Sequence, residues 1–252
     1  MVESTQIIGS NQFQHAMDLM AAATETISGT IDYRQSFVKM VGLNVSIARE
    51  SRTTLLCKSA VGYSFAAGTT DGPGMFNFTQ GTTSGNPFWD HIRDFLSEPT
   101  EEEMACQAPK PILFNTGDLQ QPYDWEPDTL SISILRIGNL FILAVPAEFT
   151  TMSGRRLRKA IHDVISASGI IPSGEPIHVT IAGLANGYSH YVTTFEEYQA
   201  QRYEAASTIY GPYTLDGYIQ EFTRYVHLCT YCALCKTYLF IKNIEFLCMQ
   251  TR

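Results

Sequence analysis

The sequence predicts an α/β fold in which helices flank a mixed β-sheet. Residues 130–145, LSISILRIGNLFILAV, have the pattern of a β-hairpin with a two-residue turn at Gly138-Asn139. An amphipathic helical pattern follows at 151–167, and a further strand pattern follows at 175–183. A strand, a helix and a second strand after an antiparallel start are typical of a mixed sheet with helices packed on it.

The N-terminal region is predicted to contain one helix and one strand. The helix is expected at 10–27, where Ser10 can cap the first turn. Residues 41–47, VGLNVSI, alternate strictly between apolar and polar side chains. This alternation predicts a half-buried strand that places Asn44 on its solvent face.

A long loop and two further elements are predicted between this strand and the hairpin. Residues 59–87 are rich in Gly and Thr and predict an ordered loop with strand fragments, and loops of this length are often functional. Asn86 and Pro87 have the residue types of a helix cap and first turn. KPILFNT at 110–116 predicts a strand.

The region after the hairpin alternates between buried and polar segments. Leu140–Val145 is continuously apolar, which predicts a central strand covered on both faces. A capping box at Thr194 is expected to start a helix that runs to about Ala206, and another helix begins near Leu215. The composition changes after residue 226, so we expect residues 1–226 to form one unit and 227–252 an atypical Cys-rich apolar tail.

The bulk composition is that of a globular protein able to bury a sizeable core. The 252 residues are 44% hydrophobic and 17% charged. A net charge of -8 argues against nucleic acid as a partner, because phosphate binding needs clustered Lys and Arg. The polar start MVESTQIIGS does not resemble a signal peptide, and the sequence contains no apolar run long enough to cross a membrane.

The cysteines and two short motifs bear on the compartment. Of the six cysteines, Cys57 and Cys106 stand alone, whereas the other four lie in the last 24 residues. The tripeptides that begin at Asn44 and Asn77 match the acceptor pattern for N-glycosylation, which occurs in secreted proteins but is also common by chance.

Glu148 lies between the apolar strand 140–145 and the helix predicted at 151–167. α/β proteins bind ligands in crevices at the carboxyl ends of their strands, so this carboxylate is a candidate binding residue. The alternative is that it faces the positive end of the following helix and is only structural. Thr150 or Thr151 can cap that helix without it, which slightly weakens the structural interpretation.

A second polar loop, 184–194, occupies the equivalent place after the strand at 175–183 and carries Tyr188, His190 and Tyr191. If the two strands are neighbours, this loop faces Glu148. A carboxylate and a phenol can both bind a hard metal or zinc, but two ligands do not complete a site. None of the six histidines forms a pair at metal-ligand spacing.

Other candidate motifs have weaker chemistry. NTGDLQQP at 115–122 has the shape of a nucleophile turn but carries Gln120 where a nucleophile is needed. Ser153 is expected in the first turn of a helix and has no evident base beside it. The cysteines of the segment 229–235 could bind metal with Cys248 or His227, but their apolar surroundings favour a structural role.

Several long segments together resemble the neutral ceramidases, zinc-dependent amidases that cleave ceramide. They cover roughly residues 4–224 and are much more specific than any short motif in the chain. The segments are GYSFAAGTTDGPGMFNFTQG, NPFWDHIRD, KPILFNTGDL, PAEFTTMSGRRLR and GYSHYVTTFEEYQAQRYEAASTIYGPYTL.

The resemblance implies a zinc ion at the bottom of a deep apolar pocket, held by two histidines, a glutamate and a tyrosine, with a serine as the nucleophile. The glutamate matches Glu148, and the tyrosine matches Tyr191, with Tyr188 as the nearby alternative. Cys57 and Cys106 match cysteines that are paired in the family, and the bridge would contribute roughly 4 kcal/mol on the chain-entropy model. The family also implies the secretory pathway, the cell surface or the extracellular space as the location.

The chain departs from the family pattern in its catalytic residues. The histidine ligands and the serine belong to an earlier part of the family, and the NTGD of 115–118 only imitates the start of the serine motif. We therefore expect the later part of a ceramidase catalytic domain, an incomplete domain that binds zinc weakly and is inactive alone.

Three interpretations stay open at this point. In the first, the full-length protein would hydrolyse ceramide, an N-acylsphingosine, to sphingosine and a fatty acid. Ceramide would be its substrate, and a membrane surface would be a further partner. Alternatively, the chain is a non-catalytic lipid-binding or regulatory module. In a third interpretation it is an unrelated α/β protein whose Glu148 is structural.

Overall fold

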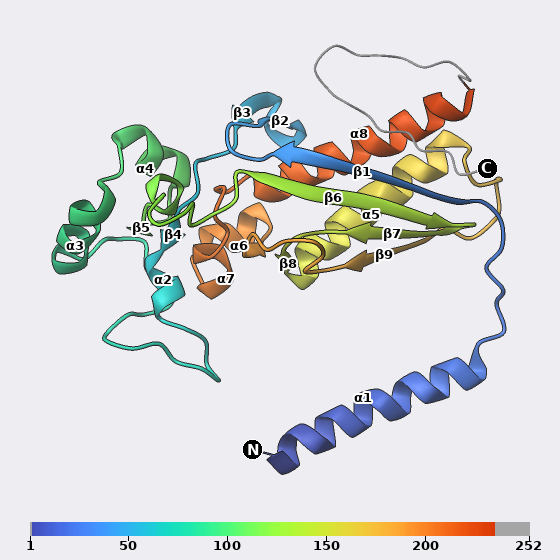
Figure 1. Cartoon of the computed structure of the whole chain (residues 1–252), viewed down its shortest axis with the longest axis horizontal. Coiled ribbons are helices and arrows are strands. Elements are labelled where there is room, and N and C mark those ends of the chain that lie inside the picture. The colour runs from blue at the N-terminus through green and yellow to red at the C-terminus, as the bar shows by residue number, and fades with distance from the viewer. Residues whose placement is uncertain (1, 235–252) are drawn as a thin grey trace.

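A four-stranded mixed sheet forms the centre of the molecule (Figure 1). The computed structural model describes residues 2–234, with side chains described up to residue 226. The sheet order is β1-β6-β7-β9, in which β1 pairs antiparallel with β6, β6 antiparallel with β7, and β7 parallel with β9. The α/β fold with a mixed sheet and flanking helices is therefore confirmed. The strands are β1 (Ile31–Lys39), β6 (Thr129–Ile137), β7 (Leu140–Ala144) and β9 (His178–Ala182).

Two long helices, α5 (Thr151–Ser168) and α8 (Thr214–Leu234), pack against each other and cover one face of this sheet (Figure 1). The predicted apolar face of α5 is buried through Leu157, Ile161 and Ile165. Leu143 of β7 is also fully buried, in the same core cluster. α8 contributes large aromatic side chains to the core, which suits a close helix–sheet contact; they are Tyr218, Phe222 and Tyr225.

Short elements lie together towards one end of the central sheet and form three small two-stranded sheets and five short helices (Figure 1). The paired strands are β2 (Asn44–Ile47) with β3 (Arg52–Leu55), β4 (Val61–Gly62) with β5 (Ile112–Phe114), and β8 (Glu148–Phe149) with β10 (Tyr191–Val192). The helices are α2 (Tyr63–Ala66), α3 (Pro87–Ser97), α4 (Glu101–Gln107), α6 (Phe195–Gln199) and α7 (Tyr203–Ala206), and 3-10 turns lie at Ala48–Glu50 and Thr116–Asp118.

Three of the helix caps predicted from the sequence are present. The Asn86 side chain accepts from the Phe88 amide at the start of α3. Thr194 and Glu197 form the capping box of α6. The Thr150 side chain accepts from the Ser153 amide and caps α5. In each case a side-chain oxygen pairs with an amide that has no partner inside its helix.

The N-terminal helix differs from the prediction of 10–27. α1 runs over Val2–Ala22, so Ser10 lies in its interior rather than at its cap. It ends where β-branched residues begin, in TETISGT, and these residues favour extended backbone. Figure 1 shows α1 standing apart from the sheet on an extended segment, and the helix has no buried residue.

Three further predictions are corrected. Residues 31–39, for which the sequence pattern predicts no element, form β1, an edge strand whose apolar Ile31 and Phe37 are exposed. The strand at 41–47 is limited to Asn44–Ile47, because a turn precedes it. The helix from Thr194 to Ala206 divides into α6 and α7, because Gln201 adopts a left-handed φ of 47° that an α-helix does not accommodate.

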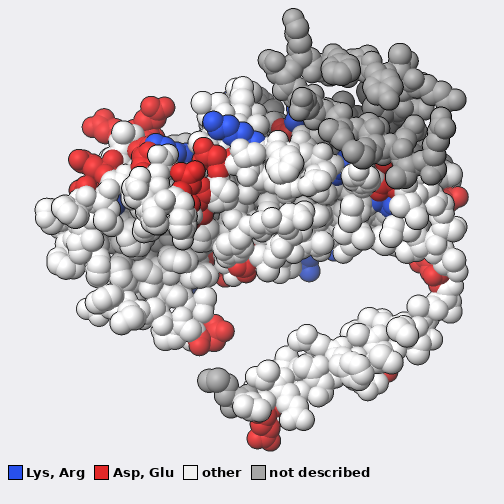
Figure 2. Space-filling model, in the orientation of Figure 1, with Lys and Arg blue, Asp and Glu red and all other residues white. Residues whose placement is uncertain are grey.

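The surface of the described chain is acidic at one end. Figure 2 shows carboxylates gathered over the region of α3 and α4, where Glu101 and Glu102 are exposed in the first turn of α4. None of the helices described is both long and apolar enough to span a bilayer. α8 continues through residue 227 to Leu234, and the predicted tail beyond it, with Cys235 and Cys248, lies outside the described residues.

Candidate metal centre

The structure brings Glu148 and Tyr191 together as direct partners. β8 and β10 form a parallel ladder in which Glu148 is level with Tyr191. The Glu148 amide donates to the His190 carbonyl at 2.9 Å, and the Thr150 amide donates to the Val192 carbonyl at 3.1 Å. Both residues are partly buried.

The parallel pairing of β7 with β9 places the β8–β10 ladder at the edge of the sheet where both strands end. Parallel strands end at the same edge of a sheet, so the segments that follow them start side by side. The Val145 amide donates to the Ala182 carbonyl at 3.0 Å, and the Ala185 amide donates back to the Val145 carbonyl at 2.9 Å. The expectation that the strands before the two polar segments are neighbours is thus confirmed.

Three phenols surround the carboxylate of Glu148. The Tyr188 hydroxyl donates to Glu148 Oε1 at 2.6 Å. Burial, followed by a hydrogen bond to Glu148, raises the pKa of Tyr188 and of Tyr191. Tyr203, on α7, is the third: its ring centroid lies 5.7 Å from that of Tyr191, and burial with the nearby Glu148 and Glu204 charges raises its pKa. Each of the three phenols therefore holds its proton more tightly than a free tyrosine does.

Tyr203 was not singled out from the sequence. It lies twelve positions beyond Tyr191, past α6 and the break at Gln201, so no helical or strand periodicity relates the two. The only signal available was its place in the long segment that resembles the ceramidases. Tertiary contacts hold Tyr203 beside the other two phenols. The Phe65 ring of α2 stacks on the Tyr203 ring, with the ring centroids 5.5 Å apart.

Thr150, not Glu148, caps α5. Its hydroxyl accepts from the Ser153 amide at 3.3 Å. The Ser153 hydroxyl is fully buried and donates to the Val192 carbonyl at 2.7 Å, so it is a structural group and not an exposed nucleophile. The capping interpretation of Glu148 therefore loses its main support.

His190 is paired with a different carboxylate. Its Nε2 lies 2.9 Å from Glu126 Oε1, and the residue adopts a left-handed φ of 59°. Within residues 2–234, no group of three or more His, Cys, Asp or Glu side chains is placed to hold a metal ion. Glu148 and its neighbouring phenols supply carboxylate and phenol oxygens, which are possible metal ligands but do not by themselves complete a four-ligand site.

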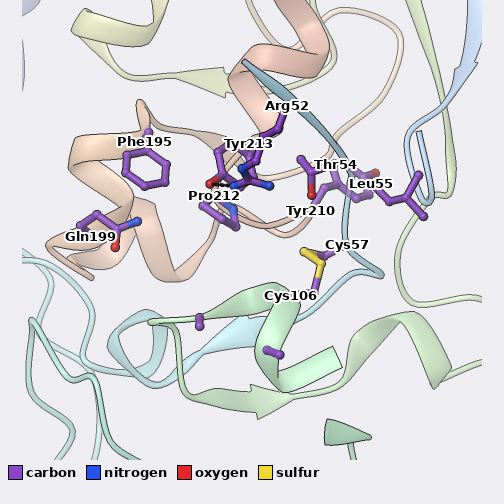
Figure 3. Close-up of a pocket in the computed structure, with 12 residues that line it drawn as sticks. Arg52, Thr54, Leu55, Cys57, Cys106, Phe195, Gln199, Tyr210, Pro212 and Tyr213 are labelled. Carbon is purple, nitrogen blue, oxygen red and sulfur yellow. Dashed lines mark hydrogen bonds between the residues drawn. A yellow bond between two sulfur atoms is a disulfide. The ribbon is translucent and has the colours of Figure 1, made fainter. Parts of the chain in front are cut away.

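The remaining predicted residues lie away from this centre. Cys57 and Cys106 form a disulfide, and Asn44 and Asn77 are both exposed. The described residues also line a cavity of about 290 Å³ beside that disulfide, walled by residues such as Arg52, Phe195 and Tyr213 (Figure 3). It contains neither Glu148 nor its phenols, so it is a separate feature.

A model of a known protein family matches most of this chain. The model described as "Neutral/alkaline non-lysosomal ceramidase, N-terminal" matches residues 1–220. The chain belongs to this ceramidase family. Neutral ceramidase 1 of Arabidopsis thaliana is 55% identical over 225 residues, which are 88% of this chain and 29% of the relative. Neutral ceramidase of Drosophila melanogaster is 47% identical over 233 residues, covering 89% and 32%.

Solved ceramidase structures have the same fold as this chain. One described as "Ceramidase complexed with C2" superimposes with a TM-score of 0.74 at 38% identity, over 91% of this chain and 34% of that one. The neutral ceramidase from Pseudomonas aeruginosa gives a TM-score of 0.72 at 36% identity. The chain thus spans about a third of the length of these relatives.

Proposed function

We propose that this chain is part of a zinc-dependent amidase that hydrolyses ceramide to sphingosine and a fatty acid. Its own contribution is Glu148 and Tyr191 as two of four zinc ligands. The observation that supports this role is the direct pairing of the two residues in the β8–β10 ladder. The relatives named neutral ceramidases support the substrate and the reaction.

The chemistry of the carboxylate suits a metal. A carboxylate that accepts from one phenol and lies level with another presents converging oxygen atoms, which are ligands for zinc. When bound, zinc would polarise the amide carbonyl of the substrate or activate a water. The chain's own task is to hold Glu148 and Tyr191 at a fixed separation while Tyr188 and Tyr203 keep polar hydrogens beside them.

We also propose that the protein passes through the secretory pathway and carries glycans on Asn44 and Asn77. The Cys57–Cys106 disulfide supports an oxidising compartment, and exposure of both asparagines supports access by the glycosylation machinery. Expression in secreting cells followed by enzymatic deglycosylation would test this: two mass steps, removed singly by Asn44→Gln and Asn77→Gln, are expected.

Substitution of the glutamate tests the zinc assignment. In a full-length neutral ceramidase, the residue aligned with Glu148 is changed to Gln, and the residue aligned with the exposed Glu196 is changed to Gln as a control. We expect the first variant to lose bound zinc and ceramide hydrolysis and the second to keep both. Unchanged zinc content and activity in the first variant would instead support a structural Glu148.

The isolated 252-residue chain provides a second test. It is expected to bind zinc weakly and to leave ceramide uncut, because half a ligand shell does not fix the metal. Ceramide hydrolysis by the purified chain would contradict the proposal. If the chain is folded and monomeric, binds lipid and does not bind zinc, the interpretation as a non-catalytic module would be favoured.

A further inference from the structure

We propose that Glu197 is a positioning residue that sets the separation of Glu148 and Tyr191. It does not touch either side chain. Its carboxylate ties together the two backbone segments that leave β8 and β10, the strands that carry the pair. The inference rests on the proposed function, because it concerns the same candidate ligands.

One oxygen of Glu197 accepts a hydrogen bond from each segment. The Thr150 hydroxyl donates to Glu197 Oε2 at 2.7 Å across a separation of 47 residues. The Thr194 amide donates to the same oxygen at 2.8 Å. Thr150 lies two residues after Glu148, and Thr194 lies three residues after Tyr191. The cap of α5 and the capping box of α6 therefore share a single acceptor.

This tie matters because the ladder it supports is short. β8 and β10 pair over two residues, and so small a ladder does not hold its own geometry in water. Hydrogen bonds to an ionised carboxylate are about twice as strong as those between neutral groups. The buried Ser153 hydroxyl reinforces the same junction, because it donates to the Val192 carbonyl at 2.7 Å and its oxygen also lies 3.0 Å from the Thr150 carbonyl oxygen.

The neighbouring carboxylate provides a matched control. Glu196 also connects α6 with α5, but through an ion pair of 2.7 Å to Arg156 in which the two side chains are 62% and 43% exposed. Exposed pairs of this kind contribute little. Glu196 also interacts with the Thr194 side chain, but the two hydrogen bonds that connect the caps, from the Thr150 hydroxyl and from the Thr194 amide, both end on Glu197. Removing its charge therefore tests whether any loss of a nearby carboxylate has the same effect.

The test uses the full 252-residue chain with zinc as the probe. Calorimetric titration compares the wild type with Glu197→Leu, Glu197→Gln and Glu196→Leu, and urea unfolding shows that each variant is folded. We expect Glu197→Leu to weaken zinc binding about tenfold, in the range typical of groups that orient metal ligands. Glu197→Gln, which keeps an acceptor oxygen, should restore most of the affinity, and Glu196→Leu should match the wild type.

A second readout, which needs no metal, is the NMR spectrum of the tyrosine rings in protein labelled with ring-¹³C tyrosine. Glu197→Leu should shift the Tyr188 and Tyr191 signals and leave those of Tyr33 and Tyr123 in place. If Glu197→Leu does not fold, Thr150→Asp replaces it: aspartate still caps α5 but repels Glu197. Wild-type zinc affinity and unshifted Tyr188 and Tyr191 signals in a folded Glu197→Leu or Thr150→Asp variant would overturn the positioning role.

Glu148→Gln separates this inference from the proposed function. If Glu148→Gln binds zinc as tightly as the wild type, the metal assignment fails, and the ring signals alone then decide the role of Glu197. If Glu148→Gln abolishes binding while Glu197→Leu does not weaken it, the metal assignment stands and the role of Glu197 is refuted.

Discussion

The Tyr188 hydroxyl lies 2.6 Å from Glu148 Oε1, although 40 residues separate them in the sequence. Tyr191, in contrast, is the residue level with Glu148 in the β8–β10 ladder. The two phenols thus have different relationships to one carboxylate. Tyr188 contacts Glu148 through a side-chain hydrogen bond, whereas Tyr191 is paired with it through the backbone of its strand as well as through its phenol.

These relationships give different expectations for the two phenols. If Tyr191 is the metal ligand, Tyr191→Phe should weaken zinc binding by more than about tenfold, at least as much as loss of an orienting group. Tyr188→Phe removes only a hydrogen bond to the other ligand and should have a smaller effect. Zinc titration of both variants measures the order, and the reverse order would assign the ligand to Tyr188.

Gly211 is required by its contact with the disulfide. A Cβ at this position would lie 2.4 Å from Cys57 Sγ, and the residue has a φ of +86°. Gly174 has a similar φ of +91° with nothing within 4 Å of its added Cβ. Gly174→Ala should therefore cost about 1–2 kcal/mol from backbone strain alone, and Gly211→Ala should cost clearly more. Equal losses of unfolding free energy in urea would show that the disulfide can move aside.

Loss of the Cys57–Cys106 bridge should destabilise the chain. The bridge joins residues separated by 49 positions. On the chain-entropy model, closing a loop of this size contributes about 4 kcal/mol. Urea unfolding of a Cys57→Ser/Cys106→Ser double variant should show a loss of this order. The wild type in reductant should behave like the double variant, and reductant should have no further effect on the variant itself; any additional loss would indicate another disulfide.

Lys110 predicts a pH dependence of stability. Its ammonium group is buried, donates to the carbonyls of Ala60 at 3.0 Å and Thr208 at 2.6 Å, and lies over the Tyr198 ring. Burial lowers the pKa of Lys110 well below its ordinary value of 10.5. The unfolded chain therefore binds this proton more readily, so stability should rise as pH increases from the folded pKa towards 10.5.

The comparison that isolates this effect is Lys110→Met, which does not titrate. The difference in unfolding free energy between wild type and variant, measured in urea between neutral pH and about pH 9.5, should shift in favour of the wild type as pH rises. Titration of the buried tyrosines cancels in this difference. A difference that does not change with pH would show that Lys110 stays charged in the folded chain.

Three strands of the central sheet, β6, β7 and β9, were predictable because their residues follow simple periodicities. The hairpin turn at Gly138-Asn139 and the apolar run of β7 have direct signatures, and α5 has a clear apolar face. β1 has none of these, because its exposed positions carry Ile31, Tyr33 and Phe37 while Asp32 and Arg34 point to the covered side. Its apolar alternation therefore marks the open face of the sheet, and only pairing with β6 defines it as a strand.

The candidate site was predictable in position but not in composition. Glu148 and the loop with Tyr191 follow strands whose parallel pairing could be inferred, so their proximity was expected. The contact of Tyr203 depends on how α6 and α7 turn at Gln201, and the sequence has no local signal for a left-handed residue there. The capping box accounts for the bond of Glu197 with the Thr194 amide, but its bond with the Thr150 hydroxyl is a tertiary contact with no local signal. Such tertiary contacts override helix propensity, which favoured a single helix.

The route of the chain between β7 and β9 has a consequence for the order of folding. Glu148 precedes α5 and Tyr191 follows β9, so the whole crossover must close before the two residues can meet. Contacts between residues so distant along the chain form late, after local helices and hairpins. If zinc binding is followed during refolding, it should therefore begin only when this crossover is complete and should be absent during the earlier collapse.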